Sequence, residues 1–347
     1  MISQTSEMLT PDGARLAIHS WMPDGVAPLG LPAAAPDQAG RAAHADEPVP
    51  GGAALAPSAP PAGARRPRAV IQIAHGMAEH AARYGRFAAA AVAAGYAVHA
   101  DDHRGHGASV AAPDGQGFLA EADGWELVLG DMSQLLDRIQ AAYPGVPVIL
   151  MGHSWGSFLA RDLATRRGEE LAGLILLGVG AGLGTLTAPG MALASAQSRL
   201  RGKRHPSRML HALAFEPYNR HFAPSRTEVD WLTRDEEEVD RYIADPGCGF
   251  VSTAGFFHDI LAGIASVSAP EHAAATPRGL PILLACGDQD PVGAMGKGAR
   301  RVATTYRRAG VREVALTLYP GARHELLNET NREEVTADLL SWIGAHV

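Results

Sequence analysis

The 347-residue chain is long enough to bury a large hydrophobic core, either as one large domain or as a domain with a subdomain. Hydrophobic residues make up 46% of it and charged residues 19%, which are ordinary proportions for a globular protein. The net charge of −7 leaves no basic excess and therefore argues against a nucleic-acid partner. Cys248 and Cys286 lie far apart without metal-ligand spacing, so we expect two separate buried thiols.

Neither a targeting signal nor a membrane span is apparent in the sequence. The N-terminal stretch MISQTSEMLTPDGARLAIHS has no basic segment followed by an apolar one, so no secretory signal is expected. No run of about eighteen apolar residues occurs, which argues against an ordinary membrane-spanning helix. Together these features predict a cytoplasmic protein.

The first elements along the chain are a hairpin and a long irregular segment. Residues 3–23 show strand-like alternation around a Pro11-Asp12-Gly13 turn, which predicts two antiparallel strands. Residues 25–68 are rich in Ala, Pro and Gly and have no period. We expect them to form a disordered insertion that the fold does not need.

From residue 69 onward, short apolar runs alternate with helical patterns. Near-continuous apolar strands that alternate with helices indicate a mostly parallel, doubly wound sheet that is covered on both faces. The strands are predicted at 69–76, 96–103, 146–152, 171–180, 280–287 and 313–320, and the helices at 83–95, 125–143, 155–168, 296–310 and from Arg332 onward.

A long stretch of helix formers, mixed with polar and aromatic residues, interrupts this alternation and predicts an inserted helical cap. The expected division of the chain is therefore a hairpin of the core sheet at 1–24, the insertion at 25–68, the first part of the core at 69–180, the cap or lid at 181–278 and the second part of the core at 279–347.

The stretch LMGHSWGS places Ser154 between Gly152 and Gly156, after an apolar strand and before a helix. A serine on so sharp a turn projects out of the sheet, and the two glycines remove side chains that would clash there. The following helix directs its N–H groups and its dipole toward the hydroxyl. We therefore predict that Ser154 is a nucleophile rather than a simple helix cap, which would need neither glycine.

A serine nucleophile needs a base, and the base needs an acid that orients it. Sites in doubly wound sheets form at the carboxyl ends of the strands. The loop after strand 280–287 offers Asp288 and Asp290, and the loop after strand 313–320 offers His324. We predict His324 as the base and Asp290 as the acid, with Asp288 organising the turn.

The negative charge that develops on a carbonyl oxygen needs backbone N–H donors. The loop AHGMAEH ends the first parallel strand, so the N–H groups of Met77 and Trp155 are the predicted oxyanion donors. His75 and Gly76 are expected to shape this turn next to the substrate, because a side chain at Gly76 could block the approaching carbonyl.

Several motifs together resemble the monoacylglycerol lipase and lysophospholipase branch of the α/β-hydrolase superfamily, a serine aminopeptidase S33-type branch. They are HGMAEHAARYGRFA, DDHRGHGAS, GHSWGS, GDQDPVG and GARHELLNE, in an α/β-hydrolase order of Ser, Asp and His. The resemblance covers about 68–180 and 279–345 and implies an α/β-hydrolase fold with Ser154, Asp290 and His324 as the triad. Trp155 stands where these relatives usually have Met, which predicts a narrower acyl pocket.

The predicted cap carries two clusters of apolar and aromatic residues, at 209–218 and 255–264, with spacings that give each helix an apolar face. Its connections emerge beside the active-site loops, so we expect the cap to cover the pocket and to line a channel for an acyl chain. Phe256 and Leu261 are the predicted substrate-binding residues of this channel.

The favoured function is a serine carboxylic-ester hydrolase that acts on a lipid-like monoester, a monoacylglycerol or a lysophospholipid, and needs no metal or organic cofactor. An aminopeptidase or acyltransferase on the same scaffold and a non-catalytic binding module remain alternatives. The cap is expected to make at most transient contact with a membrane surface, and the basic stretch 199–208 is interpreted as a solvated helix face. His103 and His106 are expected to shape their loop rather than to act as the base.

Overall fold

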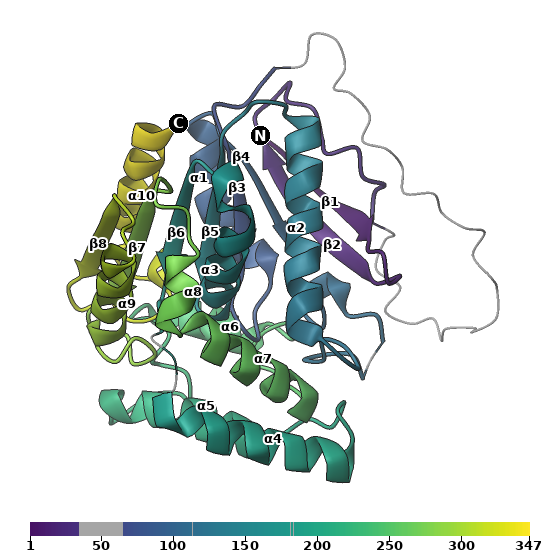
Figure 1. The fold of residues 1–347 in the computed structure, drawn as a ribbon, viewed down its shortest axis with the longest axis vertical. Coiled ribbons are helices and arrows are strands. Elements are labelled where there is room, and N and C mark those ends of the chain that lie inside the picture. The colour runs from purple at the N-terminus through teal and green to yellow at the C-terminus, as the bar shows by residue number, and fades with distance from the viewer. Residues whose placement is uncertain (35–64, 113, 181, 183) are drawn as a thin grey trace, which may run out of the picture.

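The computed structural model describes residues 1–34, 65–112, 114–180, 182 and 184–347, and in these residues it contains one sheet of eight strands (Figure 1). The strand order is β1-β2-β4-β3-β5-β6-β7-β8. The strands are β1 (Ile2–Leu9), β2 (Arg15–Met22), β3 (Val70–Ala74), β4 (Ala97–Asp101), β5 (Val148–His153), β6 (Gly173–Leu177), β7 (Ile282–Gly287) and β8 (Val314–Tyr319).

The N-terminal hairpin forms one end of this sheet, as the sequence predicts. β1 pairs antiparallel with β2 from Ile2 opposite Met22 to Leu9 opposite Arg15, and the turn between them contains Gly13 at a φ of 86°. β2 pairs antiparallel with β4, whereas β4, β3, β5, β6, β7 and β8 are parallel to one another. The prediction of a mostly parallel sheet is therefore confirmed.

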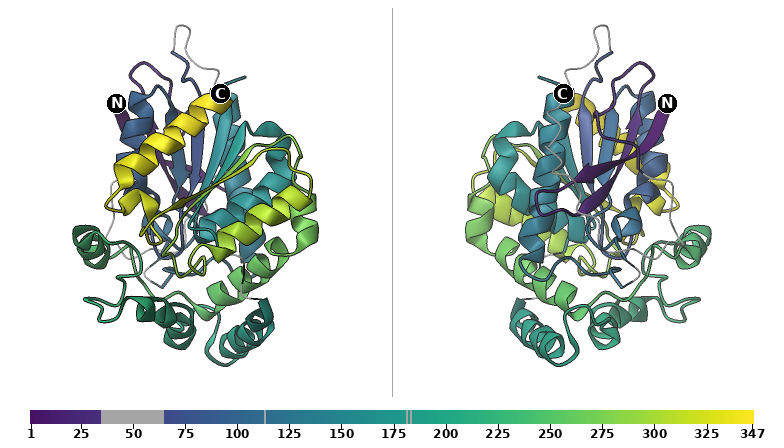
Figure 2. Two further views of the ribbon diagram at one scale, coloured as in Figure 1. Left: turned by 90° about the vertical axis from the view of Figure 1, so that its left-hand side faces the viewer. Right: turned by 90° about the vertical axis from the view of Figure 1, so that its right-hand side faces the viewer.

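Helices cover both faces of the sheet because the central strands are apolar on both. In β5, Ile149 and Met151 pack on the same side as α1 and α10, and Val148 and Leu150 pack on the side of α2, α3 and α9 (Figures 1 and 2). These helices are α1 (Gly85–Ala93), α2 (Gly124–Ala142), α3 (Trp155–Arg167), α9 (Lys297–Arg308) and α10 (Arg332–His346).

Among the described residues, five further α-helices lie between β6 and β7 in the chain, where the sequence predicts the cap. α4 to α7 form a layer beyond one end of the sheet, with α7 packed against α2, α3 and α4, whereas α8 lies beside α3 and α9 (Figures 1 and 2). The five helices are α4 (Thr187–Arg201), α5 (Arg208–Asn219), α6 (Glu236–Ala244), α7 (Ala254–Val267) and α8 (Pro270–Ala274). Among the described residues, no helix combines the length and the apolar character that crossing a membrane requires.

The predicted insertion at 25–68 has ordered ends. Val26 and Leu29 are buried, the N–H of Glu7 donates to the carbonyl oxygen of Pro32 at 2.8 Å, and the N–H of Arg65 donates to that of Gly25 at 2.9 Å. Residues 25–34 and 65–68 are therefore ordered, and the prediction of disorder is wrong for them. The rest of the predicted insertion, 35–64, lies outside the described residues.

We expect residues 35–64 to be dispensable. Replacing them with about ten Gly/Ser residues should leave kcat/KM within a few-fold and raise stability by about 1 kcal/mol, because a shorter loop costs less closure entropy. A variant in which 27–66 are replaced instead is the matched control. Its free energy of unfolding should fall by about 2 kcal/mol or more, because the replacement removes the buried Leu29. Urea unfolding and an esterase assay on both variants check this. A large loss of activity with the shorter deletion would contradict it.

Candidate active site

Ser154 lies at a strained turn between β5 and α3. Its φ of 53° and ψ of −117° are rare for a residue with a side chain. The N–H of Ser154 donates to the carbonyl oxygen of Leu177 at 3.0 Å, which holds the turn against β6. A Cβ at Gly152 would lie 2.3 Å from the oxygen of Gly156, and one at Gly156 would lie 2.2 Å from that of Ala74. Both glycines are therefore required by close backbone approach, as predicted.

His324 and Asp290 form a buried pair at the ends of the last two strands. His324 Nδ1 lies 3.0 Å from Asp290 Oδ1, and that oxygen also accepts the N–H of Val292 at 2.9 Å. The side chain of His324 is 2% exposed and that of Asp290 is fully buried, so the carboxylate can hold the imidazole in one orientation. A Cβ on Gly178, which has a φ of +57°, would lie 2.9 Å from His324 Cε1, so this glycine makes room for the ring.

One cavity of about 700 Å³ brings the separate predictions together. Ser154, His324, Gly76 and Met77 all line it, and Asp290 lies behind His324. Its remaining walls come mainly from the loops after β3 and β8 and from the cap. The cap contributes apolar and aromatic residues, Ala212, Phe215, Ala223, Val229, Trp231, Leu232, Tyr242 and Val251, and nearly as many polar or charged ones, Arg208, His211, Glu216, Asn219, Arg220, Ser225 and Glu228.

The two predicted oxyanion donors lie in suitable backbone positions. Trp155 is the first residue of α3, and the first N–H groups of a helix have no acceptor within it. Met77 stands in the turn after β3, directly before Ala78, whose φ is 53°. A Cβ at Gly76 would lie 2.6 Å from Glu79 Oε1 and 3.3 Å from Ser154 Cβ, so glycine is required next to Ser154.

Glu79 is a buried carboxylate of this site that sequence reasoning missed. Its Oε1 accepts hydrogen bonds from the N–H of Gly76 at 2.6 Å and from the Tyr84 hydroxyl at 2.9 Å, and it lies 2.9 Å from Nδ1 of His153. Burial disfavours the charge on Glu79, but the hydrogen bond and charge of His153, together with nearby Arg83, hold the pKa of Glu79 well below its usual range. Glu79 therefore fixes the turn that carries Met77.

Arg83 links Glu79 to a second buried carboxylate. It donates to Glu79 at 2.8 Å and to both oxygens of Glu325 at 2.7 and 2.6 Å. Burial lowers the pKa of His153, but its hydrogen bond with Glu79 outweighs this and raises the pKa above the usual value. The four-residue spacing between Glu79 and Arg83 could have indicated their ion pair from the sequence. The contact between Arg83 and Glu325 spans 242 positions and left no such signal.

Replacing Glu79 with Gln should destabilise the protein by about 3–5 kcal/mol at neutral pH, because it leaves buried cations without their partner. The pKa of Glu79 is lowered in the folded state, so the ionised carboxylate stabilises the fold. This contribution to the free energy of unfolding is complete above the ordinary glutamate pKa of about 4.3 and is lost as the pH falls through the pKa of the folded state. The deficit of the variant should therefore shrink at acid pH.

Urea unfolding at several pH values measures this effect. Glu126→Gln is the matched control, because its ion pair with Arg166 is half exposed and should contribute about 1 kcal/mol or less. If both variants lost the same unfolding free energy at every pH, the proposed stabilising role of the Glu79 carboxylate would be contradicted.

Three predicted substrate-binding residues do not line the cavity. His75 is fully buried, with Nδ1 2.7 Å from the oxygen of Gly76 and Nε2 accepting the N–H of His103 at 2.9 Å, so it shapes the turn as predicted without contacting the cavity. Phe256 is fully buried against Trp155, with the ring centroids 5.1 Å apart. Leu261 lies against Gly190 of α4. The predicted contact of Phe256 and Leu261 with substrate is therefore wrong for this cavity.

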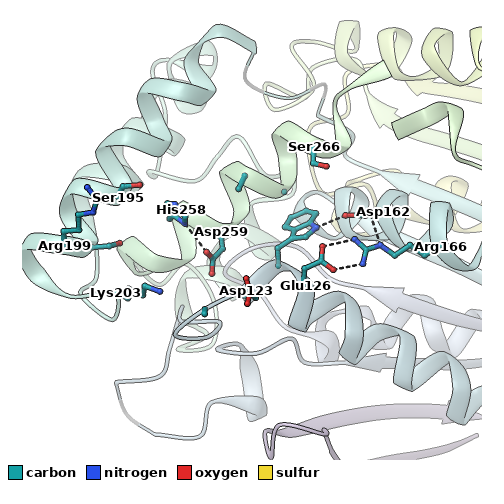
Figure 3. Close-up of a pocket in the computed structure, with 16 residues that line it drawn as sticks. Asp123, Glu126, Asp162, Arg166, Ser195, Arg199, Lys203, His258, Asp259 and Ser266 are labelled. Atoms are coloured by element: carbon teal, nitrogen blue, oxygen red, sulfur yellow. Dashed lines mark hydrogen bonds and ion pairs between the residues drawn. The ribbon is translucent and has the colours of Figure 1, made fainter. Parts of the chain in front are cut away.

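A second pocket, of about 590 Å³, lies between α2, α3, α4 and α7 (Figure 3). Some of its charged side chains pair with one another: Arg166 binds both oxygens of Glu126 at 2.6 and 2.9 Å, and His258 lies 3.2 Å from Asp259. Trp125 donates to Asp162 at 2.8 Å. The residues that line it include neither Ser154 nor His324, so this pocket is separate from the proposed site.

A doubly wound sheet with a serine on a glycine-flanked turn and a His–Asp pair on later strands defines an α/β-hydrolase. Solved structures agree on the fold: a Bacillus coagulans carboxyl esterase in complex with glycerol aligns with a TM-score of 0.82 at 24% identity, over 100% of this chain and 99% of that one. A soluble variant of the Saccharomyces cerevisiae monoglyceride lipase aligns with a TM-score of 0.70 at 18% identity, over 100% of this chain and 96% of that one.

Residues 65–331 match the family model described as serine aminopeptidase, S33, and the chain belongs to this family. It is 30% identical to a monoacylglycerol lipase of Mycolicibacterium smegmatis over 291 residues, which cover 81% of this chain and 90% of that protein. It is 29% identical to the human monoglyceride lipase over 283 residues, which cover 81% of this chain and 82% of that protein. The chain is therefore an ester hydrolase similar to monoacylglycerol lipases, which confirms the resemblance that its motifs predict.

Proposed function

We propose that this protein hydrolyses monoacylglycerols through a Ser154, His324 and Asp290 triad. The observation that carries the proposal is the meeting of Ser154 and the His324–Asp290 pair at one cavity under the cap. No metal or organic cofactor enters the proposed reaction.

In the proposed reaction, Ser154 Oγ attacks the ester carbonyl while His324 Nε2 takes its proton, and Asp290 stabilises the resulting imidazolium. The carbonyl oxygen becomes negative and accepts hydrogen bonds from the N–H groups of Met77 and Trp155. His324 then returns the proton to the departing glycerol oxygen, which leaves an acyl group on Ser154. Water, activated by His324, attacks this acyl-enzyme and releases the fatty acid.

The cavity supports a small lipid-like substrate. Its volume lies in the usual range for small-molecule sites, and its cap wall includes apolar and aromatic side chains, among them Phe215 and Trp231, that suit one acyl chain. Two cap carboxylates, Glu216 and Glu228, and two cap guanidinium groups, Arg208 and Arg220, line the cavity. This mixed charge favours a neutral head group such as glycerol over the cationic amine of a peptide.

A hydrolysis panel tests the substrate class. Monoacylglycerols should be cleaved faster than lysophospholipids of the same chain length and much faster than aminoacyl amides. Faster cleavage of the amide would favour the aminopeptidase alternative, and complete inactivity with no labelling by a fluorophosphonate would favour the binding module.

We expect kcat/KM to rise several-fold for every two carbons of the acyl chain until the cavity is filled, because each buried CH₂ contributes about 0.8 kcal/mol. Phe215→Ser should flatten this dependence, since Phe215 lines the cavity and stacks with Trp231 at 6.0 Å. Leu213→Ser is the matched control, as Leu213 lies on the same helix but is 63% exposed and outside the cavity. The measurement is a series of p-nitrophenyl esters, and a wild type without chain-length preference would contradict the acyl channel.

We also propose that the cap makes transient contact with membrane surfaces. Four of its large apolar side chains are exposed by between 44% and 85%: Leu186, Leu200, Met209 and Leu213. Arg199 and Arg201 of α4 and Arg208 of α5 lie close in the chain to three of them, so this segment of the cap is both apolar and cationic. Cosedimentation with phosphatidylglycerol vesicles, reduced by Leu200→Asp, tests the contact.

A further inference from the structure

A histidine, an aspartate and a cysteine meet where the cap touches the loop after β3. The side chains are those of His80, Asp245 and Cys248, and their ligand atoms all lie within 4.8 Å of one another. His80 belongs to the core and follows Glu79, whereas Asp245 and Cys248 belong to the turn after α6 in the cap. The proposed catalytic reaction uses none of these three groups.

The cap side of this cluster is held in place by its own backbone. The N–H of Cys248 donates to the carbonyl oxygen of Asp245 at 3.0 Å, which closes a turn and brings the two side chains together. The N–H of Gly247 donates to Asp245 Oδ1 at 2.8 Å, so Oδ2 faces His80 Nε2, also at 2.8 Å. A Cβ on Gly247 would lie 3.0 Å from His80 Cδ2 and would crowd the ring.

We propose that His80, Asp245 and Cys248 form a zinc-binding site that joins the cap to the core. Imidazole nitrogen, carboxylate oxygen and thiolate sulfur are the three ligand types that proteins offer to Zn²⁺. Three protein ligands leave a fourth tetrahedral position for water. The Asp245 side chain is 35% exposed, which provides a route for the ion and the water from solvent.

Both negative and positive side chains lie around the sulfur. Burial raises the pKa of the Cys248 thiol, the guanidinium of Arg83 lowers it, and the carboxylates of Asp245, Glu79 and Glu325 raise it. The three carboxylates attract Zn²⁺, and a thiol that coordinates the ion is deprotonated outright. On binding, the thiol proton passes to solvent and the direct hydrogen bond between His80 Nε2 and Asp245 Oδ2 is given up. The neutral imidazole then presents the Nε2 lone pair to the ion, with its proton on Nδ1.

The proposed ion would strengthen an existing connection to the oxyanion loop. The N–H of Gly249 and the hydroxyl of Tyr242 both donate to the carbonyl oxygen of Ala78, at 2.9 and 3.2 Å. Ala78 separates Met77 from Glu79, so the cap turn already supports the loop that carries a proposed oxyanion donor. Two residues further along, zinc would replace the direct contact between His80 and Asp245 with coordination by three side chains. By binding only the folded state, it would stabilise the protein.

Cobalt(II) substitution and zinc titration test this site on the full chain. The wild type with Co²⁺ should show a thiolate-to-cobalt charge-transfer band and the visible bands of a tetrahedral site. Cys248→Ser should abolish the charge-transfer band, and Asp245→Asn should weaken Zn²⁺ binding by at least about tenfold in competition with a chromophoric chelator. Cys286→Ser, at a buried cysteine outside the cluster, is the matched control. It should keep both the charge-transfer band and the zinc affinity of the wild type.

Thermal unfolding gives an independent measurement. Zn²⁺ should raise the Tm of the wild type and of Cys286→Ser, but not that of Cys248→Ser, whose circular dichroism without metal shows whether it is folded. The absence of a thiolate band in the wild type, or unchanged zinc affinity in folded Cys248→Ser, would overturn the proposal. Neither result would contradict the proposed esterase function, because the proposed reaction involves no metal.

Discussion

Replacing Ser154 with alanine should lower kcat by about 10⁶-fold and leave the protein folded. Loss of a triad nucleophile removes the covalent route entirely, and only the oxyanion donors and substrate binding continue to act. Ser154 has a positive φ that alanine tolerates no worse than serine does, and its hydroxyl makes no contact on which the core depends. The unfolding free energy should therefore change little while the activity disappears.

Ser225→Ala is the matched control, because Ser225 lines the same cavity from the cap. The control should keep near wild-type activity and its labelling by a fluorophosphonate, and Ser154→Ala should lose both. A folded Ser154→Ala variant that retains a tenth of the wild-type activity would falsify the proposed mechanism.

The core of the fold was predictable because each of its elements has a strong local pattern. β5 is apolar on both faces, α2 repeats its apolar residues with helical spacing, and the two are separated by Pro144 and Gly145. The chain order of such elements leaves few topologies for a parallel sheet. Residues at the ends of its strands, such as Asp290 and His324, then meet at one edge whatever the details of packing.

The cap was less predictable, because helix periodicity identifies an apolar face but not the partner that covers it. Phe256 and Leu261 lie on α7, whose apolar face packs against α2, α3 and α4. The cavity is instead lined by Phe215 of α5 and by Trp231, which lies in a segment without helical pattern. Docking of helices depends on the shapes of both surfaces, which a single sequence does not reveal.

Polar clusters between distant segments were equally inaccessible from sequence. Cys248 seemed to be an isolated thiol, since its neighbours in the chain have no metal-ligand spacing. Its cluster becomes visible only when folding brings His80 next to Asp245, across 165 positions of the chain. The contact between Arg83 and Glu325 is of the same kind.

Replacing Asp290 with asparagine should lower kcat by about 10⁴-fold, by analogy with the same change in serine proteases. Asp290 Oδ1 holds Nδ1 of His324 at 3.0 Å in a buried setting, where the charge of the carboxylate stabilises the imidazolium that forms during attack. A neutral amide can keep the hydrogen bond with Val292 but cannot supply this charge, and its NH₂ group favours the wrong tautomer if it turns toward the ring.

Asp288→Asn is the matched control two residues earlier, and its effect on kcat should stay within about tenfold. Asp288 Oδ1 accepts the N–H of Gly321 at 2.8 Å and the side-chain amide of Gln289 at 3.1 Å, so it organises the loops without touching His324. An asparagine oxygen can accept the same hydrogen bonds, which is why the turn should survive. Steady-state kinetics and the rate of fluorophosphonate labelling on both variants give the comparison. If Asp288→Asn proved the more damaging change, the acid of the triad would be Asp288, and the short contact between Asp290 and His324 would need another explanation.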